Sequence, residues 1–247
     1  MNQQEKKTIC INKYKLTYSE TGKGKPILFL HGGRVRANTF KRYIKILSKN
    51  YKVFAPDIPG YGDSETPKDA WSFIEYGEFF AHFLHKLHLT QVIVIGYSMG
   101  GGIAFNVAAQ SSDVSELILI DSAGISLPHT KYSHQDMRRL WFYLSHPQYT
   151  SSLMIIIRDY LQFIIKHRVT INRIQHIRRA CAHTSYNQIL RHIRIPTTLI
   201  WGEDDWIYPL TIANEFKKHM PHAVLKTVTG NHDWLIYNPL QYKDLML

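Results

Sequence analysis

A serine flanked by glycines is the most informative chemical group in this sequence. Gly96-Tyr97-Ser98-Met99-Gly100 fits the pattern G-x-S-x-G, and it stands between a β-branched run that begins at Val92 and a segment from Ile103 to Ala109. These flanks predict a strand buried on both faces, then a helix. The turn between them holds a serine in a strained, exposed position, and it needs glycine where the chain reverses closely. Ser98 is therefore a candidate nucleophile.

A serine hydroxyl needs a base within hydrogen-bond reach and a group that orients the base. Two later segments offer these groups. Trp201-Gly202-Glu203-Asp204-Asp205 follows the next-to-last predicted strand, and Thr229-Gly230-Asn231-His232 follows the last. Among fourteen histidines, His232 stands out because it lies in a glycine-containing turn just past a strand. We expect Ser98 to attack an acyl carbonyl while His232 takes its proton.

Strands and helices alternate along most of the chain, which predicts an α/β fold with a mostly parallel central sheet and helices on both faces. The expected elements are a hairpin over Thr8–Glu20, strands at Pro26–Leu30, Tyr51–Ala55, Leu117–Ile120, Thr198–Trp201 and Val224–Val228, and helices at Thr39–Lys49, Trp71–Leu87, Leu210–His219 and the C-terminus. Binding sites in such sheets lie at the carboxyl ends of the strands. The polar residues that follow predicted strand ends are His31, Asp57, Ser98, Asp121, Asp205 and His232.

The alternation stops after Ile125, and the segment to about His192 shows mostly helical spacing. We therefore expect a core of residues 1–124 and 195–247, with a helical insertion over 125–194. The insertion carries most of the whole chain's net charge of +11, because it holds 11 Lys or Arg residues and only two acids, Asp136 and Asp159. This asymmetry indicates either a solvated basic face or an anionic partner, such as an acidic acyl carrier or a membrane surface.

Several classes of protein are disfavoured. No apolar run approaches the roughly 20 residues that span a bilayer, and the polar N-terminus lacks a signal-peptide core, so a cytoplasmic protein is expected. Cys10 and Cys181 do not suggest a disulfide framework. The absence of H-E-x-x-H, of paired cysteines and of G-x-G-x-x-G after the first strand predicts no metal and no cofactor. No recognised nucleic-acid motif accompanies the charge, so nucleic acid is not an expected partner.

Four further motifs make the chain resemble the α/β-hydrolase family over roughly Lys25–Gly124 and Ile195–Pro239. They are His31-Gly32-Gly33, which is similar to the family's oxyanion loop, Asp57 to Ser64 (D-x-P-G-x-G-x-S), Gly202 to Pro209 (G-x-x-D-x-x-x-P) and Gly230 to His232 (G-x-H). The resemblance implies a triad of Ser98, Asp205 and His232, with no metal. It makes Asp57 a residue that structures its loop. Asp121 stays open as an alternative acid, and Asp204 is expected to cap a helix or to be solvated.

The resemblance also implies which groups surround the reaction. The backbone N–H of Met99, after the serine, and that of Gly33 are expected to form the oxyanion hole. The insertion would act as a cap that selects the substrate. The side chains expected to bind substrate are Arg34, Tyr97, Trp141 and Tyr160.

These expectations together predict a serine hydrolase that cleaves a small or medium carboxylic ester or thioester through an acyl-enzyme, as carboxylesterases do. Carbon–carbon bond hydrolases of aromatic degradation also begin the oxyanion loop with His-Gly-Gly. They usually carry asparagine where this chain has Tyr97, and a longer glycine run where it has Arg34-Val35-Arg36. A ligand-binding or receptor-type protein with little turnover is the alternative outside enzymes.

Overall fold

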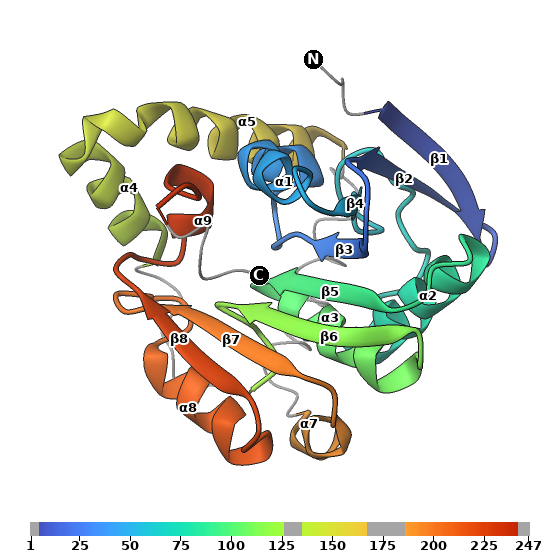
Figure 1. The fold of residues 1–247 in the computed structure, drawn as a ribbon. Coiled ribbons are helices and arrows are strands. Elements are labelled where there is room, and N and C mark those ends of the chain that lie inside the picture. The colour runs from blue at the N-terminus through green and yellow to red at the C-terminus, as the bar shows by residue number, and fades with distance from the viewer. Residues whose placement is uncertain (1–4, 126–134, 167–185, 242–247) are drawn as a thin grey trace.

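A computed structural model of the chain describes residues 5–125, 135–166 and 186–241 (Figure 1). Eight strands form one sheet in the order β1-β2-β4-β3-β5-β6-β7-β8. Their bounds are β1 Glu5–Ile11, β2 Tyr14–Thr21, β3 Pro26–Leu30, β4 Lys52–Pro56, β5 Val92–Tyr97, β6 Val114–Ile120, β7 Thr197–Gly202 and β8 Val224–Val228. The predicted fold class is confirmed, since β3 to β8 pair in parallel and only β1–β2 and β2–β4 pair antiparallel.

The first two strands form the predicted hairpin. Asn12 and Lys13 join them with φ of 43° and 67°, the left-handed conformation that a two-residue turn needs to match the twist of its strands. Both are residues other than glycine, and asparagine tolerates this region better than most.

Helices cover the two faces of the sheet. The helical bounds are η1 Ala37–Phe40, α1 Lys41–Leu47, α2 Phe73–Lys86, α3 Met99–Gln110, α4 Gln135–Ser145, η3 Pro147–Tyr149, α5 Thr150–Lys166, α7 Asn187–His192, α8 Leu210–His219 and α9 Trp234–Tyr237. No helix in the described part of the chain is long and apolar enough to cross a membrane.

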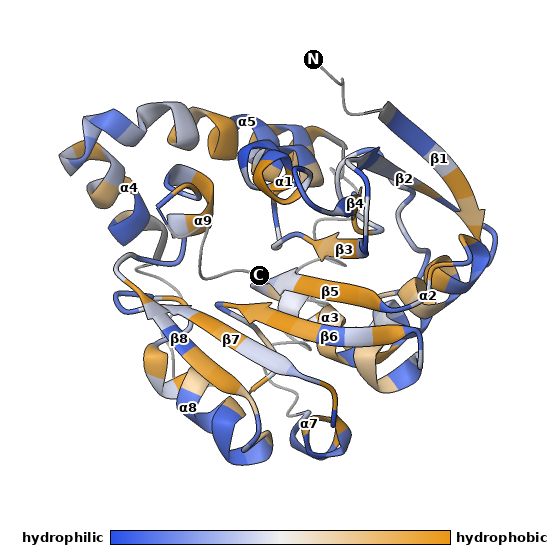
Figure 2. Ribbon diagram, viewed as in Figure 1, coloured by the Kyte–Doolittle hydropathy of each residue, from blue (hydrophilic) through white to orange (hydrophobic). Residues whose placement is uncertain are grey.

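The core is divided by the sheet into two layers. In β3, Leu28 and Leu30 belong to the buried cluster that includes residues of α2, α3 and α8, whereas Ile27 and Phe29 belong to the cluster that includes residues of α1 and α9. Successive residues of a strand point to opposite faces, so a strand that is apolar throughout satisfies both layers. Figure 2 shows this as nearly continuous orange along β3 and β5. The layers hold the carboxyl ends of the parallel strands at a common edge.

The bounds of three helices differ from the predictions. The helix expected at Thr39–Lys49 is divided into η1 and α1, and α3 begins directly after Ser98 rather than at Ile103. The helix after β8 is short, four residues in α9.

The segment between β6 and β7 contains the helices α4, η3, α5 and α7; residues 126–134 and 167–185 lie outside the described residues. The ring of Phe163 in α5 stacks on Tyr61, at 5.4 Å between centroids. Arg139 in α4 pairs with Asp233, next to His232. These two helices therefore contact loops at the carboxyl edge of the sheet.

Candidate active site

Ser98 occupies a strained turn between β5 and α3. Its backbone has φ 53° and ψ −119°, a region that costs of order 1–3 kcal/mol outside glycine. Hydrogen bonds on both sides hold the turn: Ser98 N–H donates to the carbonyl of Ile120 at 2.9 Å, and Ala123 N–H donates to the carbonyl of Ser98 at 3.0 Å. The end of β6 thus keeps the serine at the tip of the turn.

Gly100 makes the sharp turn possible because the chain there lies against β3. A Cβ at this position would stand 2.1 Å from the carbonyl oxygen of Leu30 and 2.6 Å from that of His31. These are backbone atoms that cannot move aside independently. We expect Gly100→Ala to lower the free energy of unfolding by about 3 kcal/mol or more, measured by denaturant unfolding. Gly33→Ala is the control, because its Cβ would meet nothing closer than 3.5 Å and should leave stability nearly unchanged.

His232 lies between Ser98 and Asp205 in a continuous hydrogen-bonded row. Its Nε2 is 3.0 Å from Ser98 Oγ, and its Nδ1 is 2.7 Å from Asp205 Oδ2. The histidine and the aspartate are both buried. Because Nδ1 faces a carboxylate, it carries the ring proton, and this leaves Nε2 free to accept the proton of the hydroxyl. The row has the geometry of a nucleophile, a base and a group that orients the base.

The other oxygen of Asp205 is held by the backbone. Oδ1 accepts hydrogen bonds from the N–H groups of Ile207 at 2.7 Å and Tyr208 at 2.9 Å. These two donors fix the plane of the carboxylate and leave Oδ2 for the histidine.

Asp121 is fully buried beside this row but has different partners. Its oxygens accept hydrogen bonds from Gly202 N–H and from Trp234 Nε1–H, each at 2.8 Å. Burial, and then the negative charge of Asp205, raise the pKa of Asp121 well above its usual range. Ligating atoms of Asp121, Asp205 and His232 lie within 4.8 Å of one another. Both oxygens of Asp121 and both oxygens of Asp205 already have hydrogen-bond partners within the protein, so we describe the cluster as a hydrogen-bonded support.

The loop after β3 lies against the serine turn. A Cβ at Gly32 would be 3.4 Å from the Cβ of Ser98, and one at Gly33 would be 3.5 Å from the Sδ of Met99. His31 anchors this loop: its Nε2 accepts a hydrogen bond from Ile58 N–H at 2.9 Å, and its Nδ1 is 2.7 Å from the carbonyl of Gly32. Burial lowers the pKa of His31, which favours the neutral ring, and its Nδ1–H donates to the carbonyl of Gly32.

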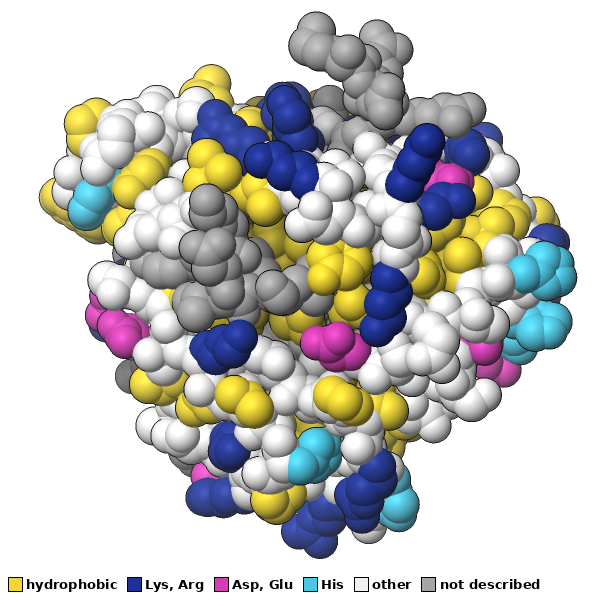
Figure 3. All heavy atoms as spheres, in the orientation of Figure 1, with side chains coloured by type: hydrophobic (Ala, Val, Ile, Leu, Met, Phe, Trp, Pro, Cys, Tyr) yellow, Lys and Arg dark blue, Asp and Glu magenta, His cyan; other side chains and the backbone are white. Residues whose placement is uncertain are grey.

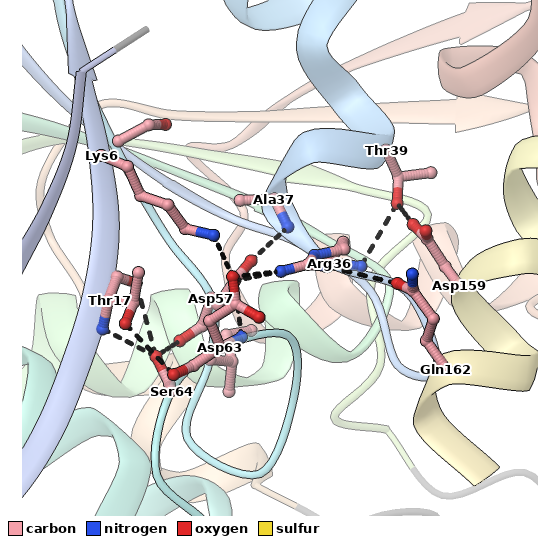
Figure 4. A network of polar contacts seen from close by, with 12 residues as sticks. Lys6, Thr17, Arg36, Ala37, Thr39, Asp57, Asp63, Ser64, Asp159 and Gln162 are labelled. Carbon is pink, nitrogen blue, oxygen red and sulfur yellow. Dashed lines mark hydrogen bonds and ion pairs between the residues drawn. The ribbon is translucent and has the colours of Figure 1, made fainter. Parts of the chain in front are cut away.

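Asp57 organises its loop, as Figure 4 shows. Its carboxylate accepts hydrogen bonds from the N–H groups of Ala37 and Asp63, both at 2.9 Å, and lies 3.3 Å from Arg36 Nη2. Ser64 Oγ donates to the carbonyl of Asp57 at 2.5 Å. The carboxylate therefore joins the loop after β4 to the loop after β3, in agreement with the structuring role predicted for it.

The side chains predicted to bind substrate lie in different places. Tyr97 is buried, and its hydroxyl donates to the carbonyl of His232 at 2.7 Å, so it supports the histidine loop. The guanidinium of Arg34 lies 5.5 Å from the ring centroid of Tyr160, and Arg34 lines a pocket of about 290 Å³ with Tyr61 and Phe163. Trp141 is 66% exposed, and the structure does not bring it to the other site residues.

Comparison with known families agrees with this geometry. The profile of the family described as "alpha/beta hydrolase fold" matches residues 25–150, more than half of the chain. The chain belongs to the alpha/beta hydrolase fold family. The match covers the oxyanion-type loop, the Asp57 loop and the serine turn.

Relatives in this family have several activities. The chain is 26% identical over 219 residues to a 2-hydroxy-6-oxo-6-(2'-aminophenyl)hexa-2,4-dienoic acid hydrolase of Metapseudomonas resinovorans, covering 81% of this chain and 74% of that protein. A solved serine hydrolase involved in carbazole degradation superposes with a TM-score of 0.85 at 22% identity, covering 98% and 97% of the two chains. An esterase from Exiguobacterium antarcticum has a TM-score of 0.77 at 19% identity, covering 98% of each chain. These two solved structures share the fold of this chain.

Two contacts of the hydrolase site were not predicted from the sequence. Tyr61, inside the Asp57 loop, places its hydroxyl 3.4 Å from the Sδ of Met99. Arg139 makes a two-pronged ion pair with Asp233, at 2.7 and 2.8 Å. In the sequence, only the position of Asp233 next to His232 pointed to a role for it near the site, because its ion-pair partner Arg139 lies 94 residues away.

Arg139 is expected to stabilise this hydrolase through the ion pair. The carboxylate of Asp233 is 1% exposed, so Arg139→Gln leaves a buried charge without its partner and should cost about 3 kcal/mol of unfolding free energy. Lys218→Gln is the control, since Lys218 and Glu215 form an exposed pair worth less than about 1 kcal/mol. Thermal unfolding of the two variants gives the comparison, and equal losses would refute the assignment.

Proposed function

We propose that this protein is a serine hydrolase that cleaves a small or medium carboxylic ester or thioester. The observation that carries the proposal is the row Ser98–His232–Asp205, with contacts of 3.0 and 2.7 Å. Ser98 Oγ attacks the acyl carbonyl as His232 Nε2 takes its proton. His232 then returns this proton to the leaving alcohol or thiol as its bond to the acyl carbon breaks. Water, deprotonated by the same nitrogen, releases the acid and restores the serine.

The negative oxygen of the tetrahedral intermediate needs donors that are already in place. The N–H groups of Met99 and Gly33 fit this role, because the Gly33 loop lies against the residue after the serine. Each such donor typically contributes about 2.7–4 kcal/mol to the stability of the transition state. Asp205 keeps the imidazole of His232 in the tautomer with its proton on Nδ1, and it stabilises the charged imidazolium that forms during the reaction.

Residues 125–194 are proposed to act as a cap over the 1–124 and 195–247 core. A pocket shared by the two parts supports this, because Arg34 and Tyr61 of the core line it together with Phe163 of α5. Tyr61 links this pocket to the serine turn, since its hydroxyl lies 3.4 Å from the Sδ of Met99. The wall holds the aromatic rings of Tyr61 and Phe163 together with charges of both signs, Arg34 and Arg36 with Asp63 and Asp159, which suits an acyl or alcohol group with an apolar body and polar substituents. Arg34 and Tyr160 are the proposed substrate contacts.

Carbon–carbon bond hydrolysis is the second candidate, and the similarity to the dienoic acid hydrolase of M. resinovorans favours it. The same serine, histidine and oxyanion donors would serve a carbonyl whose leaving group is carbon. A ligand-binding protein with little turnover is disfavoured by the complete row.

A direct assay separates these functions. The purified protein is mixed with p-nitrophenyl esters of graded acyl length, and in parallel with a 2-hydroxy-6-oxo-hexa-2,4-dienoate, whose loss of absorbance reports carbon–carbon cleavage. An ester hydrolase should release p-nitrophenol in a burst equal to the enzyme concentration when deacylation is slow. Faster turnover of the dienoate than of every ester would move the assignment to carbon–carbon hydrolysis. If neither the esters nor the dienoate are turned over, the ligand-binding protein becomes the favoured assignment.

A further inference from the structure

Two helices of the insertion carry apolar side chains on the face that points away from the core. In α4, Arg139 and Tyr143 face the Asp233 loop, and the opposite side exposes Met137, Leu140, Trp141 and Leu144. Their spacing of three and four residues makes one stripe. α5 repeats the arrangement: Ser152, Ile156 and Asp159 are buried, and the opposite side exposes Met154, Ile157, Leu161 and Ile165. We call these eight apolar residues, with Arg138 and Arg158, the outer helical surface.

The exposure is far larger than a solvated helix face normally shows. Trp141 is 66% exposed, Leu144 63%, Met154 60% and Ile165 74%. Scattered apolar residues on a surface are normal, whereas contiguous stripes on two neighbouring helices mark an interaction site. α4 and α5 are joined only by η3, and the two helices follow one another along the outside of the fold (Figure 1).

Cations border this surface, and acids are scarce on it. From Met137 to Ile165 the sequence holds three arginines and one acid, Asp159. Asp159 is buried, whereas Arg158, its ion-pair partner, keeps a half-exposed side chain. Exposed Lys41, Arg42 and Lys45 lie on α1, which continues from the η1 turn that α5 contacts. Figure 3 shows hydrophobic side chains over α4 and Lys or Arg side chains over α5 and α1.

We propose that the outer helical surface docks on an anionic lipid bilayer. Helices that lie in a membrane interface combine an apolar face with Lys or Arg, and tryptophan prefers this region. A second copy of the chain is a poorer occupant, because a two-fold contact pairs this surface with an identical one, and both would be basic with almost no exposed acid to offset the repulsion. This inference does not depend on the proposed reaction.

Trp141 provides a built-in reporter of docking. Trp201 and Trp234 are fully buried, and Trp71 and Trp206 are partly buried, so a change in tryptophan fluorescence on docking should come mainly from position 141. Addition of phosphatidylglycerol vesicles should shift the emission to shorter wavelength and sediment the protein, and phosphatidylcholine vesicles should do so much less. Trp141→Phe should keep sedimentation and lose most of the shift.

Paired substitutions test the surface itself. Leu144→Ser with Leu161→Ser should weaken sedimentation with phosphatidylglycerol vesicles by at least about tenfold, with an unchanged circular dichroism spectrum. The matched control is Val224→Ser with Leu240→Ser, two positions exposed by 54% and 64% elsewhere, which should bind as the parent does. Vesicle binding that the first pair leaves intact, or no binding at all, would overturn the proposal. A dimer in sedimentation velocity that the first pair dissociates would assign the surface to a second copy instead.

Discussion

Ser98→Ala is expected to lower the hydrolytic rate by about 10⁵- to 10⁶-fold. The variant keeps the turn and its supporting hydrogen bonds, which involve the backbone of Ser98, but it has no oxygen to attack the acyl group. Oxyanion donors and substrate binding remain, so a small residual rate above water is expected. The rate of p-nitrophenol release, followed with the best ester of the panel, measures the loss.

A covalent probe gives an independent measurement of the same prediction. With an alkyl fluorophosphonate, Ser98 Oγ should displace fluoride and gain the phosphonyl group, seen as a single mass increase in the intact protein. Ser98→Ala should show no increase. Ser112→Ala removes an exposed serine just after α3 and should be labelled like the parent. An adduct on Ser98→Ala would mean that another residue is the nucleophile.

Asp205→Asn is expected to lower kcat by about 10⁴-fold through the histidine tautomer. The N–H groups of Ile207 and Tyr208 both point at Oδ1 of Asp205, so the amide oxygen of asparagine must take that place. Its NH₂ group then faces His232 Nδ1 and donates to it. The ring proton is forced onto Nε2, which can no longer accept the proton of Ser98.

Asp121→Asn is the comparison that decides between the two candidate acids. Asp121 accepts one N–H at each oxygen, from Gly202 and Trp234, and asparagine can satisfy only one of them. We expect a loss of about 1–3 kcal/mol in unfolding free energy, with a much smaller loss of kcat than Asp205→Asn. A larger kcat loss for the Asp121 variant would reverse the assignment of the acid.

Local sequence determined much of the fold because the relevant interactions are short in range. The β-branched run and the glycines around Ser98 are enough to predict the strand, the turn and the helix that follows. Asn12-Lys13 between two alternating segments is enough to predict the hairpin. The predicted strands were found within a few residues of their positions, because burial on both faces demands continuous apolar runs.

Tertiary structure alone decided how side chains from different strand ends meet. Asp121 and Asp205 follow adjacent strands, β6 and β7, and sequence spacing cannot show which of them faces His232. Tyr97 adjoins the serine in the chain, yet the turn directs its hydroxyl to the histidine loop.

The outward face of α4 was equally undetermined by the sequence. Helical periodicity groups Trp141 with other apolar residues, but which side meets the core depends on the partner that the core offers. That partner is Asp233, 94 residues from Arg139, and the ion pair turns Trp141 away from the site. Local patterns set the elements because their energetics involve neighbours in the chain, whereas the site and the outer helical surface depend on contacts that exist only after the sheet has assembled.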